Sequence, residues 1–172
     1  TTLTLQNSRF LGNSSMAGGA VYLNYTYGEF ANCLFSGNNA NTTGGAIYAA
    51  GDTQYVKMWN CTVSKNTATN SAGGVYVSTG SDAELRNSIV WGNTAGNGTT
   101  EQQQITTVTA HGSFLTKTYS NVQGVDADPK MVDPDGADNI AGNFDDDCRL
   151  MQGSPCIDAA DASVLPPDWG DL

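Results

Sequence analysis

The sequence predicts an all-β fold: a right-handed parallel β-helix, or solenoid, followed by an irregular acidic C-terminal module. The first observation is a seven-residue frame that occurs four times, with Asn at the first and seventh places and an apolar residue at the fourth. The second is a Gly-Gly pair before an apolar run, which recurs between the frames at steps of 26 and 29 residues. Short runs separated by turn residues, with a period in the twenties, are typical of β-solenoids. The frames read NSRFLGN from Asn7, NCLFSGN from Asn32, NCTVSKN from Asn60 and NSIVWGN from Asn87.

Each repeat contains about three strand-like runs. In the second repeat these runs are residues 27–32, the frame at 32–38 and the run at 44–49. In a parallel coil each turn lies on the one before it at the strand spacing of ~4.8 Å, so equivalent residues form ladders. We expect the apolar ladders to point inward. They are Phe10, Phe35, Val63 and Val90 in one run, and Val21, Ile47 and Val75 in another.

The Asn residues of the frame are predicted to form structural ladders at the corners of the coil. Asn tolerates left-handed backbone geometry, and its side chain can bond to the backbone of the neighbouring turn. These residues are Asn32, Asn38, Asn60, Asn66, Asn87 and Asn93. After Asn93 the pattern weakens, and the next Asn in a frame-like setting is Asn121. Residues 103–122 still alternate polar with apolar, which predicts further strands.

The charge of the chain divides it into two regions. Residues 1–120 carry five acids and five bases, whereas residues 121–172 carry twelve Asp against Lys130 and Arg149, which accounts for the whole net charge of −10. We therefore expect coils over 1–120 and an acidic module over 121–172 that packs on them. Such a negative field disfavours nucleic acid as a partner. No apolar run approaches the ~20 residues that span a bilayer.

A calcium site is the densest chemical signal in the acidic module. Carboxylates at alternate places around a Gly turn, followed by three consecutive Asp, resemble the oxygen-rich loops that bind Ca²⁺. The order of residues is not that of an EF-hand. A solvated acidic loop is the alternative, but six close carboxylates repel one another unless a cation neutralises them. The expected ligands are Asp133, Asp135, Asp138, Asp145, Asp146 and Asp147.

The four cysteines form two pairs. Cys148 and Cys156 close a short loop and are a possible disulfide, which would suit an extracellular protein. Cys33 and Cys61 hold the same place in successive frames, which favours a stack of small buried residues over a bridge. Neither pair has the CxxC spacing of a zinc or redox site.

A ladder of tyrosines is the candidate ligand face. Tyr22, Tyr48 and Tyr76 each follow an inward-pointing residue, so they should face outward. Stacked tyrosines at a surface suit sugar rings or a partner protein; strand propensity alone explains them equally well. Evidence for catalysis is thinner. Asp52 and Asp82 follow corresponding strands, as a pair of hydrolase carboxylates would, but two surface turns account for them better.

With both markers in place, NCLFSGNNANTTGGAIY resembles the repeats of bacterial right-handed parallel β-helix surface proteins of the polymorphic outer-membrane-protein type, which pair GGA-apolar with F-x-x-N. The segments 128–150 and GSPCIDAAD (153–161) resemble the end module of such secreted proteins. The resemblance implies a bacterial, extracellular or cell-surface protein with a structural or adhesive role. It further implies a longer β-helix chain. A β-helix also has open ends whose strand edges invite pairing, so self-association of copies end to end into fibres is the other expectation. A carbohydrate-binding or polysaccharide-degrading β-helix is the alternative.

Overall fold

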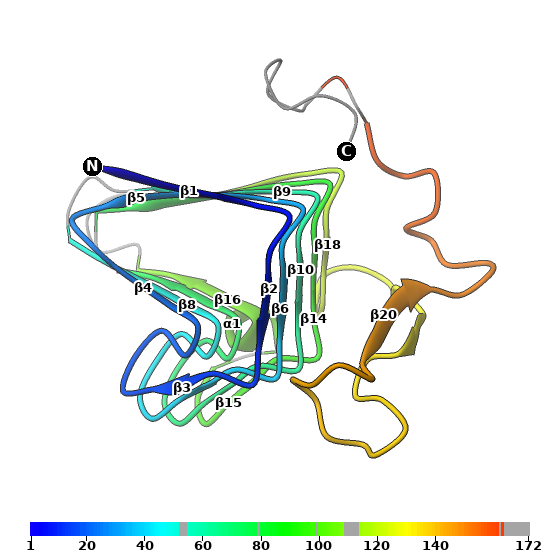
Figure 1. Ribbon diagram of the computed structural model, residues 1–172. Helices are drawn as coiled ribbons and strands as arrows, with labels where there is room; N and C mark the ends of the chain where they lie inside the picture. Colours follow the sequence, from blue (N-terminus) through cyan, green and yellow to red (C-terminus); the bar gives the residue numbers. More distant parts are fainter. Residues whose placement is uncertain (52–54, 79, 99, 109–113, 162, 164–172) are drawn as a thin grey trace.

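The computed structural model describes residues 1–51, 55–78, 80–98, 100–108, 114–161 and 163. It confirms the predicted β-helix. Within the described residues, four parallel sheets, here called sheets A to D, wrap around one core, and strands from successive turns lie side by side (Figure 1). A short antiparallel pair near the C-terminus completes the strands in the described part of the chain.

Sheet A contains the longest strands, and they carry the run that precedes each frame. Sheet A consists of β1 (Thr2–Gln6), β5 (Tyr27–Ala31), β9 (Tyr55–Trp59), β13 (Asp82–Arg86) and β17 (Leu115–Thr118). The frame itself forms sheet B, which consists of β2 (Arg9–Leu11), β6 (Leu34–Ser36), β10 (Thr62–Ser64), β14 (Ile89–Trp91) and β18 (Asn121–Val122). β18 therefore extends the coil two residues beyond the expected boundary at residue 120.

After the frame, each turn contains two further strands, whereas the sequence predicted only one. Sheet D carries the run after Gly-Gly and consists of β4 (Val21–Asn24), β8 (Ile47–Ala50), β12 (Val75–Val77) and β16 (Ile105–Thr107). Sheet C consists of the two-residue strands β3 (Ser14–Ser15), β7 (Asn39–Ala40), β11 (Thr67–Ala68) and β15 (Thr94–Ala95). The prediction of about three runs per repeat missed sheet C because two small or polar residues give no alternation to detect.

The apolar ladders point inward, as predicted. Phe35, Val63 and Val90 are fully buried and pair in register across β6, β10 and β14. Phe10 stacks on Phe35 with ring centroids 4.7 Å apart. Each turn therefore covers the apolar side chains of the turn before it, which is how a chain with so few long apolar runs builds a continuous core.

The first Asn of each frame turns the corner between sheets A and B. Asn7, Asn32, Asn60 and Asn87 all have φ of 50–52°, the left-handed conformation that Asn tolerates. In the last turn Tyr119 takes this place with φ 50°. Asn121, the next Asn in a frame-like setting, does not hold the corner: it lies two residues further on, opposite Ile89 in sheet B.

The second Asn of each frame forms a buried hydrogen-bonded ladder. The Oδ1 atom of Asn66 accepts hydrogen bonds from the backbone N and the Nδ2 of Asn38, both at 2.8 Å. Asn93 accepts the same pair from Asn66 at 3.0 and 2.8 Å. The ladder ends at Gln104, in the short helix α1 (Thr100–Gln104), where a strand was expected.

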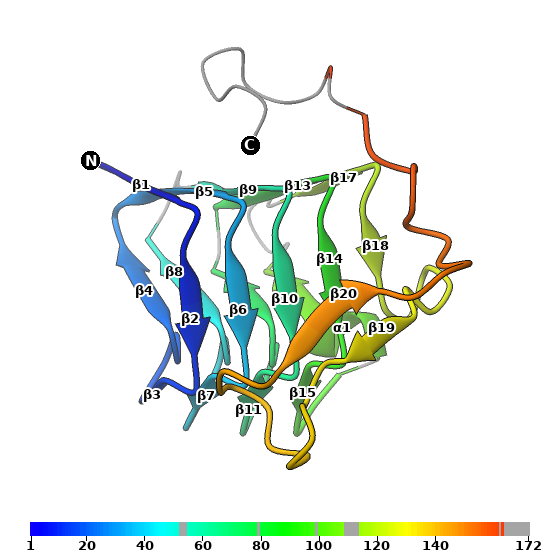
Figure 2. The same cartoon turned by 45° about the vertical axis from the view of Figure 1, so that its right-hand side comes forward.

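The acidic segment lies across the outer face of sheet B (Figure 2). It contains the antiparallel strands β19 (Met131–Asp133) and β20 (Asp147–Leu150). Gly37 and Gly142 allow its close approach, because a Cβ on Gly37 would lie 2.2 Å from the backbone oxygen of Ala141. Among the described residues, no helix has the length and apolar character to cross a membrane.

Candidate functional site

The predicted tyrosine ladder exists and faces outward from sheet D. Tyr22, Tyr48 and Tyr76 occupy equivalent places in β4, β8 and β12. Their rings stack with centroids 5.1 and 5.2 Å apart and interplanar angles of 19° and 6°. Buried residues flank each of them in the strand, so the alternation of the strand holds the rings at the surface.

A shallow groove of about 590 Å³ runs beside the start of this ladder. Its walls include Tyr22, Tyr48, Met16 and the hydroxyl-bearing residues Thr42 and Thr43. Met16 is exposed at 67 % and Tyr22 at 54 %, so the groove carries apolar surface in contact with solvent. An amphipathic ligand would find aromatic and hydroxyl groups together here.

The stacking decides which parts of the rings a ligand can reach. Tyr48 has Tyr22 on one face of its ring and Tyr76 on the other. Both ring faces are therefore covered, and a ligand can reach only the hydroxyl end of this side chain. Burial raises the pKa of Tyr48 above its ordinary value of 10, and the neighbouring tyrosines raise it further. The ladder presents a row of phenol hydroxyl groups that repeats with the period of the coil.

Sheet A carries a second ladder that was not predicted from the sequence. Glu29, Lys57 and Glu84 lie opposite one another in β5, β9 and β13. The carboxylate of Glu29 accepts a hydrogen bond from the hydroxyl of Tyr55 at 3.0 Å, and Glu84 pairs with Arg86 at 2.5 Å. These three residues lie at the same distance in sequence before the first Asn of the following frame, which could have revealed the ladder. The spacing is informative only when the register of the strands is known.

The structure adds no support for Asp52 and Asp82 as a pair of hydrolase carboxylates. Asp82 lies at the start of β13, where its Oδ1 accepts a hydrogen bond from the backbone N of Phe114 at 2.9 Å. This contact caps the neighbouring turn. Asp52 lies outside the described residues.

The predicted calcium ligands are held by different partners in the acidic segment. Asp135 forms an ion pair with Lys65 of the coil at 3.0 Å. Asp147 pairs with Arg149 at 2.6 Å, and this contact lowers the pKa of Asp147 to about 2. Asp138 accepts hydrogen bonds from the backbone N of Ile140 and from Asn143.

The other three carboxylates differ in burial. Asp146 is 8 % exposed, and its Oδ2 accepts hydrogen bonds from Ser36 Oγ at 2.6 Å and from the backbone N of Gly142 at 2.8 Å. Its Oδ1 is buried without a hydrogen-bond partner among the described residues. Asp145 is exposed beside Gly136, and Asp133 is the last residue of β19.

This arrangement does not fit the predicted calcium site. Ca²⁺ takes six to eight oxygen ligands. In the described part of the chain, no three His, Cys, Asp or Glu side chains come together as a metal site would require. The orphaned Oδ1 of Asp146 supplies one oxygen. What Asp146 and Asp135 do in this structure is tie the acidic segment to sheet B.

None of the four cysteines is paired in the structure. The predicted bridge between Cys148 and Cys156 is therefore not formed. Burial and the carboxylates of Asp146 and Asp147 raise the pKa of Cys148 to about 11. Cys33 and Cys61 are buried in successive turns, as expected for stacked small residues, and each Sγ donates to the backbone of sheet A.

The fold and these surfaces define a class: a parallel β-solenoid scaffold with an aromatic ladder on one face and an acidic segment tied to another. The right-handed β-helix region family matches residues 1–122, so the chain belongs to that family. No curated protein and no solved structure matches it.

Proposed function

We propose that this protein is an extracellular structural or adhesive β-helix in which the tyrosine ladder is the contact surface. The observation that carries the proposal is the regular stack of Tyr22, Tyr48 and Tyr76 at the surface of sheet D. A contact repeated once per turn gives avidity to a partner with a comparable repeat, even when each contact is weak. An extracellular polysaccharide is the partner that best suits a row of neutral hydroxyls beside an apolar groove.

Co-sedimentation with insoluble polysaccharides tests this role. Tyr48→Ala removes the middle ring and should abolish retention on the polymer that the protein binds. Tyr48→Phe keeps the stack and loses one hydroxyl, so it separates the contribution of the phenol row from that of the rings. Tyr55→Ala, on sheet A, is the matched control. Equal retention of the Tyr48→Ala variant and the parent would reject the tyrosine face as the contact surface.

Association of copies end to end is the second form that a structural role would take. The last turn argues against simple head-to-tail stacking. Gln104 bonds to Asn93, and Gln123 Oε1 accepts a hydrogen bond from the backbone N of Gly92 at 2.8 Å, in the place of a further turn. Sedimentation velocity at rising protein concentration tests association: fibres require growth in mass, and a constant monomer mass rejects them.

The polysaccharide-degrading alternative has one supporting observation, the ladder of Glu29, Lys57 and Glu84 on sheet A. Release of reducing sugars or unsaturated products from pectin-like or alginate-like polymers would favour it over adhesion. The Glu84→Gln variant should then lose that activity while retaining polymer binding at the tyrosine face.

A further inference from the structure

The hydroxyl groups of the tyrosine ladder are free and accessible. Within the described residues, the hydroxyls of Tyr22, Tyr48 and Tyr76 make no hydrogen bond, and none of them belongs to the buried polar atoms that lack a partner. The hydroxyl of Tyr55 on sheet A differs, because it already donates to Glu29 at 3.0 Å. A phenol hydroxyl can both donate and accept a hydrogen bond. The ladder therefore offers a row of free donor and acceptor groups to a ligand outside the protein.

The spacing of the ladder is set by the coil. Neighbouring ring centroids lie 5.1 and 5.2 Å apart, close to the spacing of the strands. Repeated weak contacts add up only when one ligand can engage them simultaneously. A ligand of the whole row must therefore run straight along the coil axis and carry hydrogen-bonding units at nearly the same interval.

An extended chain of β-1,4-linked pyranose sugars has this geometry. Each sugar lengthens such a chain by nearly the distance between two strands, and hydroxyl groups line both edges of the ribbon. The α-1,4-linked chain of the same sugar curves into a helix, so its hydroxyls soon leave the row. The linkage alone thus decides whether successive sugars meet successive tyrosines.

Sheet D leaves room for a flat ribbon beside the tyrosines. The next outward residues of the same strands are Asn24 in β4 and Ala50 in β8, and Ser78 directly follows β12. All three side chains are shorter than tyrosine, so the rings stand above them as a ridge. On the side where the strands begin, Met16 and Tyr22 line the groove of about 590 Å³. The substituents of a glycan on the ridge can therefore lie on either side of it.

The charge of the protein favours a neutral glycan over an anionic one. None of the residues that line this groove is charged. The chain as a whole has a net charge of −10. Its field repels polyuronates such as pectin and alginate, and no basic side chain of the groove offsets that repulsion.

We propose that the tyrosine ladder binds a neutral, extended β-1,4-linked glycan that lies along the coil axis, with one sugar at each tyrosine. The inference rests on the proposed function and names the class of its ligand. Thr106 follows Tyr76 in the same column, and its hydroxyl already donates to the backbone oxygen of Gln102 at 2.7 Å. The row of free hydroxyls ends there, so the site holds three sugars.

The linkage is tested with two oligosaccharides of identical composition. Isothermal titration calorimetry compares cellohexaose, which is β-1,4-linked, with maltohexaose, which is α-1,4-linked. Cellohexaose should bind at least about tenfold more tightly, because it alone reaches all the hydroxyls of the row. Equal affinities would overturn the inference. The proposed function would survive that result if Tyr48→Ala still lowered retention on a polysaccharide, and would fall with it if Tyr48→Ala changed no binding.

The length of the oligosaccharide tests the number of contacts. The affinity should rise about tenfold from cellobiose to cellotriose, because the third sugar adds the third contact. From cellotriose to cellohexaose it should rise by less than about fivefold, because the longer chain only offers more registers for the same contacts. A steady rise with every added sugar would contradict a site of three tyrosines.

Variants without single hydroxyls assign the binding to the ladder. Tyr48→Phe keeps the stacked ring and should weaken cellohexaose binding about fivefold, the effect of one hydrogen bond. Tyr76→Phe should do the same, and it should reduce the advantage of cellotriose over cellobiose to about twofold. Tyr55→Phe is the matched control and should leave binding unchanged, because the hydroxyl of Tyr55 bonds to Glu29. Unchanged affinity in both ladder variants would reject the hydroxyl row as the site.

Tetraoses with different substituents separate the sources of such a chain. Cellotetraose, chitotetraose, mannotetraose and xylotetraose share the extended β-1,4-linked backbone. The one that binds most tightly identifies the polymer, and a loss of its affinity in Tyr48→Phe supports the site. Binding of an oligogalacturonate in preference to all of them would contradict the proposal, because that ligand is anionic.

Discussion

Gln104 Oε1 accepts hydrogen bonds from both nitrogens of Asn93, the backbone amide and the side-chain amide, each at 2.9 Å. Gln104 Nε2 in turn donates to the backbone oxygen of Asn93 at 2.9 Å. Gln104 thus supplies Asn93 with the acceptor oxygen that each earlier Asn of the ladder receives from the Asn of the next turn. Both residues are almost fully buried. Among the described residues, Gln104 is the only one beyond Asn93 that bonds to its side chain, because the other Nδ2 bond is donated backwards, to the backbone oxygen of Val63 at 2.9 Å.

Gln104→Ala should lower the free energy of unfolding by about 3 kcal/mol, because the backbone N–H of Asn93 and one of its two side-chain N–H groups lose their acceptor, while the other still donates to Val63. Chemical denaturation followed by circular dichroism measures the change. Glu101→Ala, on the exposed side of the same helix, should cost less than about 0.5 kcal/mol. Equal effects of the two variants would mean that Gln104 acts only through the helix and not as the end of the ladder.

Gly37→Ala should release the acidic segment from sheet B. Gly37 and Gly92 occupy the same place in the second and fourth frames, with φ of 61° and 71°. A Cβ on Gly37 meets Ala141 O at 2.2 Å, whereas on Gly92 nothing lies closer than Lys65 Cδ at 3.5 Å. Both variants carry the strain of a left-handed Ala, ~1–2 kcal/mol.

Only Gly37→Ala adds the clash, so limited proteolysis should cut within residues 128–160 faster in that variant than in Gly92→Ala. The same rate of cleavage in both variants would show that the contact between Gly37 and Ala141 does not hold the segment in solution.

Calcium gives a direct comparison between the sequence and the structure. A structural calcium site over Asp133–Asp147 predicts a higher melting temperature in millimolar calcium chloride than in EDTA. The structure ties Asp135 to Lys65 and Asp146 to Ser36, so we expect no difference between the two conditions. A rise of several degrees with calcium, absent in Asp146→Asn, would restore the prediction from the sequence.

The tyrosine ladder predicts a delayed ionisation. Because the folded-state pKa of Tyr48 lies above its ordinary value of 10, its contribution to stability is complete below that pH and is lost as the pH rises through the folded value. Ultraviolet titration of tyrosinate should show late ionisation that is reduced in Tyr48→Phe; the remaining late part belongs to Tyr55, whose pKa is raised by burial and by Glu29. A titration curve with no late step would contradict the stacked arrangement in solution.

The thiols give a simple count. Four free thiols should react with Ellman's reagent after denaturation without reductant, because the structure contains no disulfide among Cys33, Cys61, Cys148 and Cys156. In the folded protein Cys33 and Cys61 should be protected, being 2 % and 1 % exposed. A count of two after denaturation would show one disulfide in the isolated protein, and the loss of that disulfide in Cys156→Ser would assign it to Cys148 and Cys156.

The sequence predicted what the repeat itself enforces. Phe35 and Val63 could be placed in one ladder because a stacked coil has to bury the same position in each turn. Tyr22 followed from the alternation of a strand. The ends of the ladders were not predictable in the same way, because they break the pattern that reveals the rest: Tyr119 replaces Asn at a corner, and Gln104 comes from a helix.

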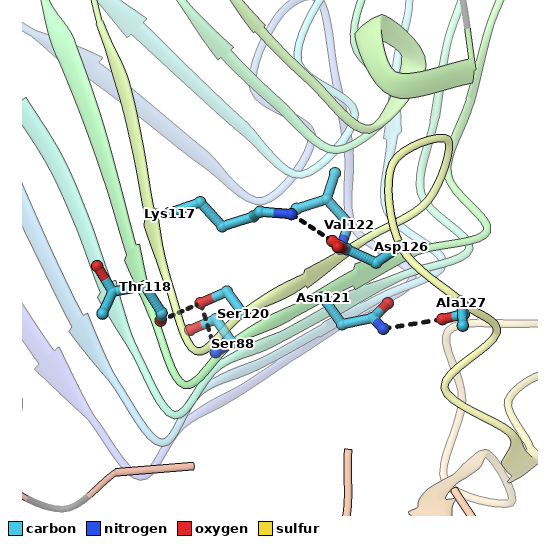
Figure 3. Close-up of polar contacts among 8 residues, drawn as sticks. All are labelled: Ser88, Lys117, Thr118, Ser120, Asn121, Val122, Asp126 and Ala127. Carbon is cyan, nitrogen blue, oxygen red and sulfur yellow. Dashed lines mark hydrogen bonds and ion pairs between the residues drawn. The ribbon is translucent and has the colours of Figure 1, made fainter. Parts of the chain in front are cut away.

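The contacts between regions were also beyond the sequence. Lys65 and Asp135 are 70 residues apart, and nothing in their neighbourhoods marks them as partners. The contacts of Asn121 with Ala127 and of Asp126 with Lys117 depend on how the segment after β18 folds back on the coil (Figure 3). The period of the repeat gives no information about that path, so these contacts could not be predicted.

The Asn ladder has a direction, and this bears on how such a chain can change length. Each Asn presents to the turn before it the same oxygen that it needs from the turn after it, so any interior turn can be followed by a copy of itself. Duplicating residues 60–86 should yield a longer protein with every amide satisfied. The last turn is different, because Asn93 bonds onward to Gln104 and not to another Asn. A duplicated turn can therefore be inserted before Gln104 but cannot replace it.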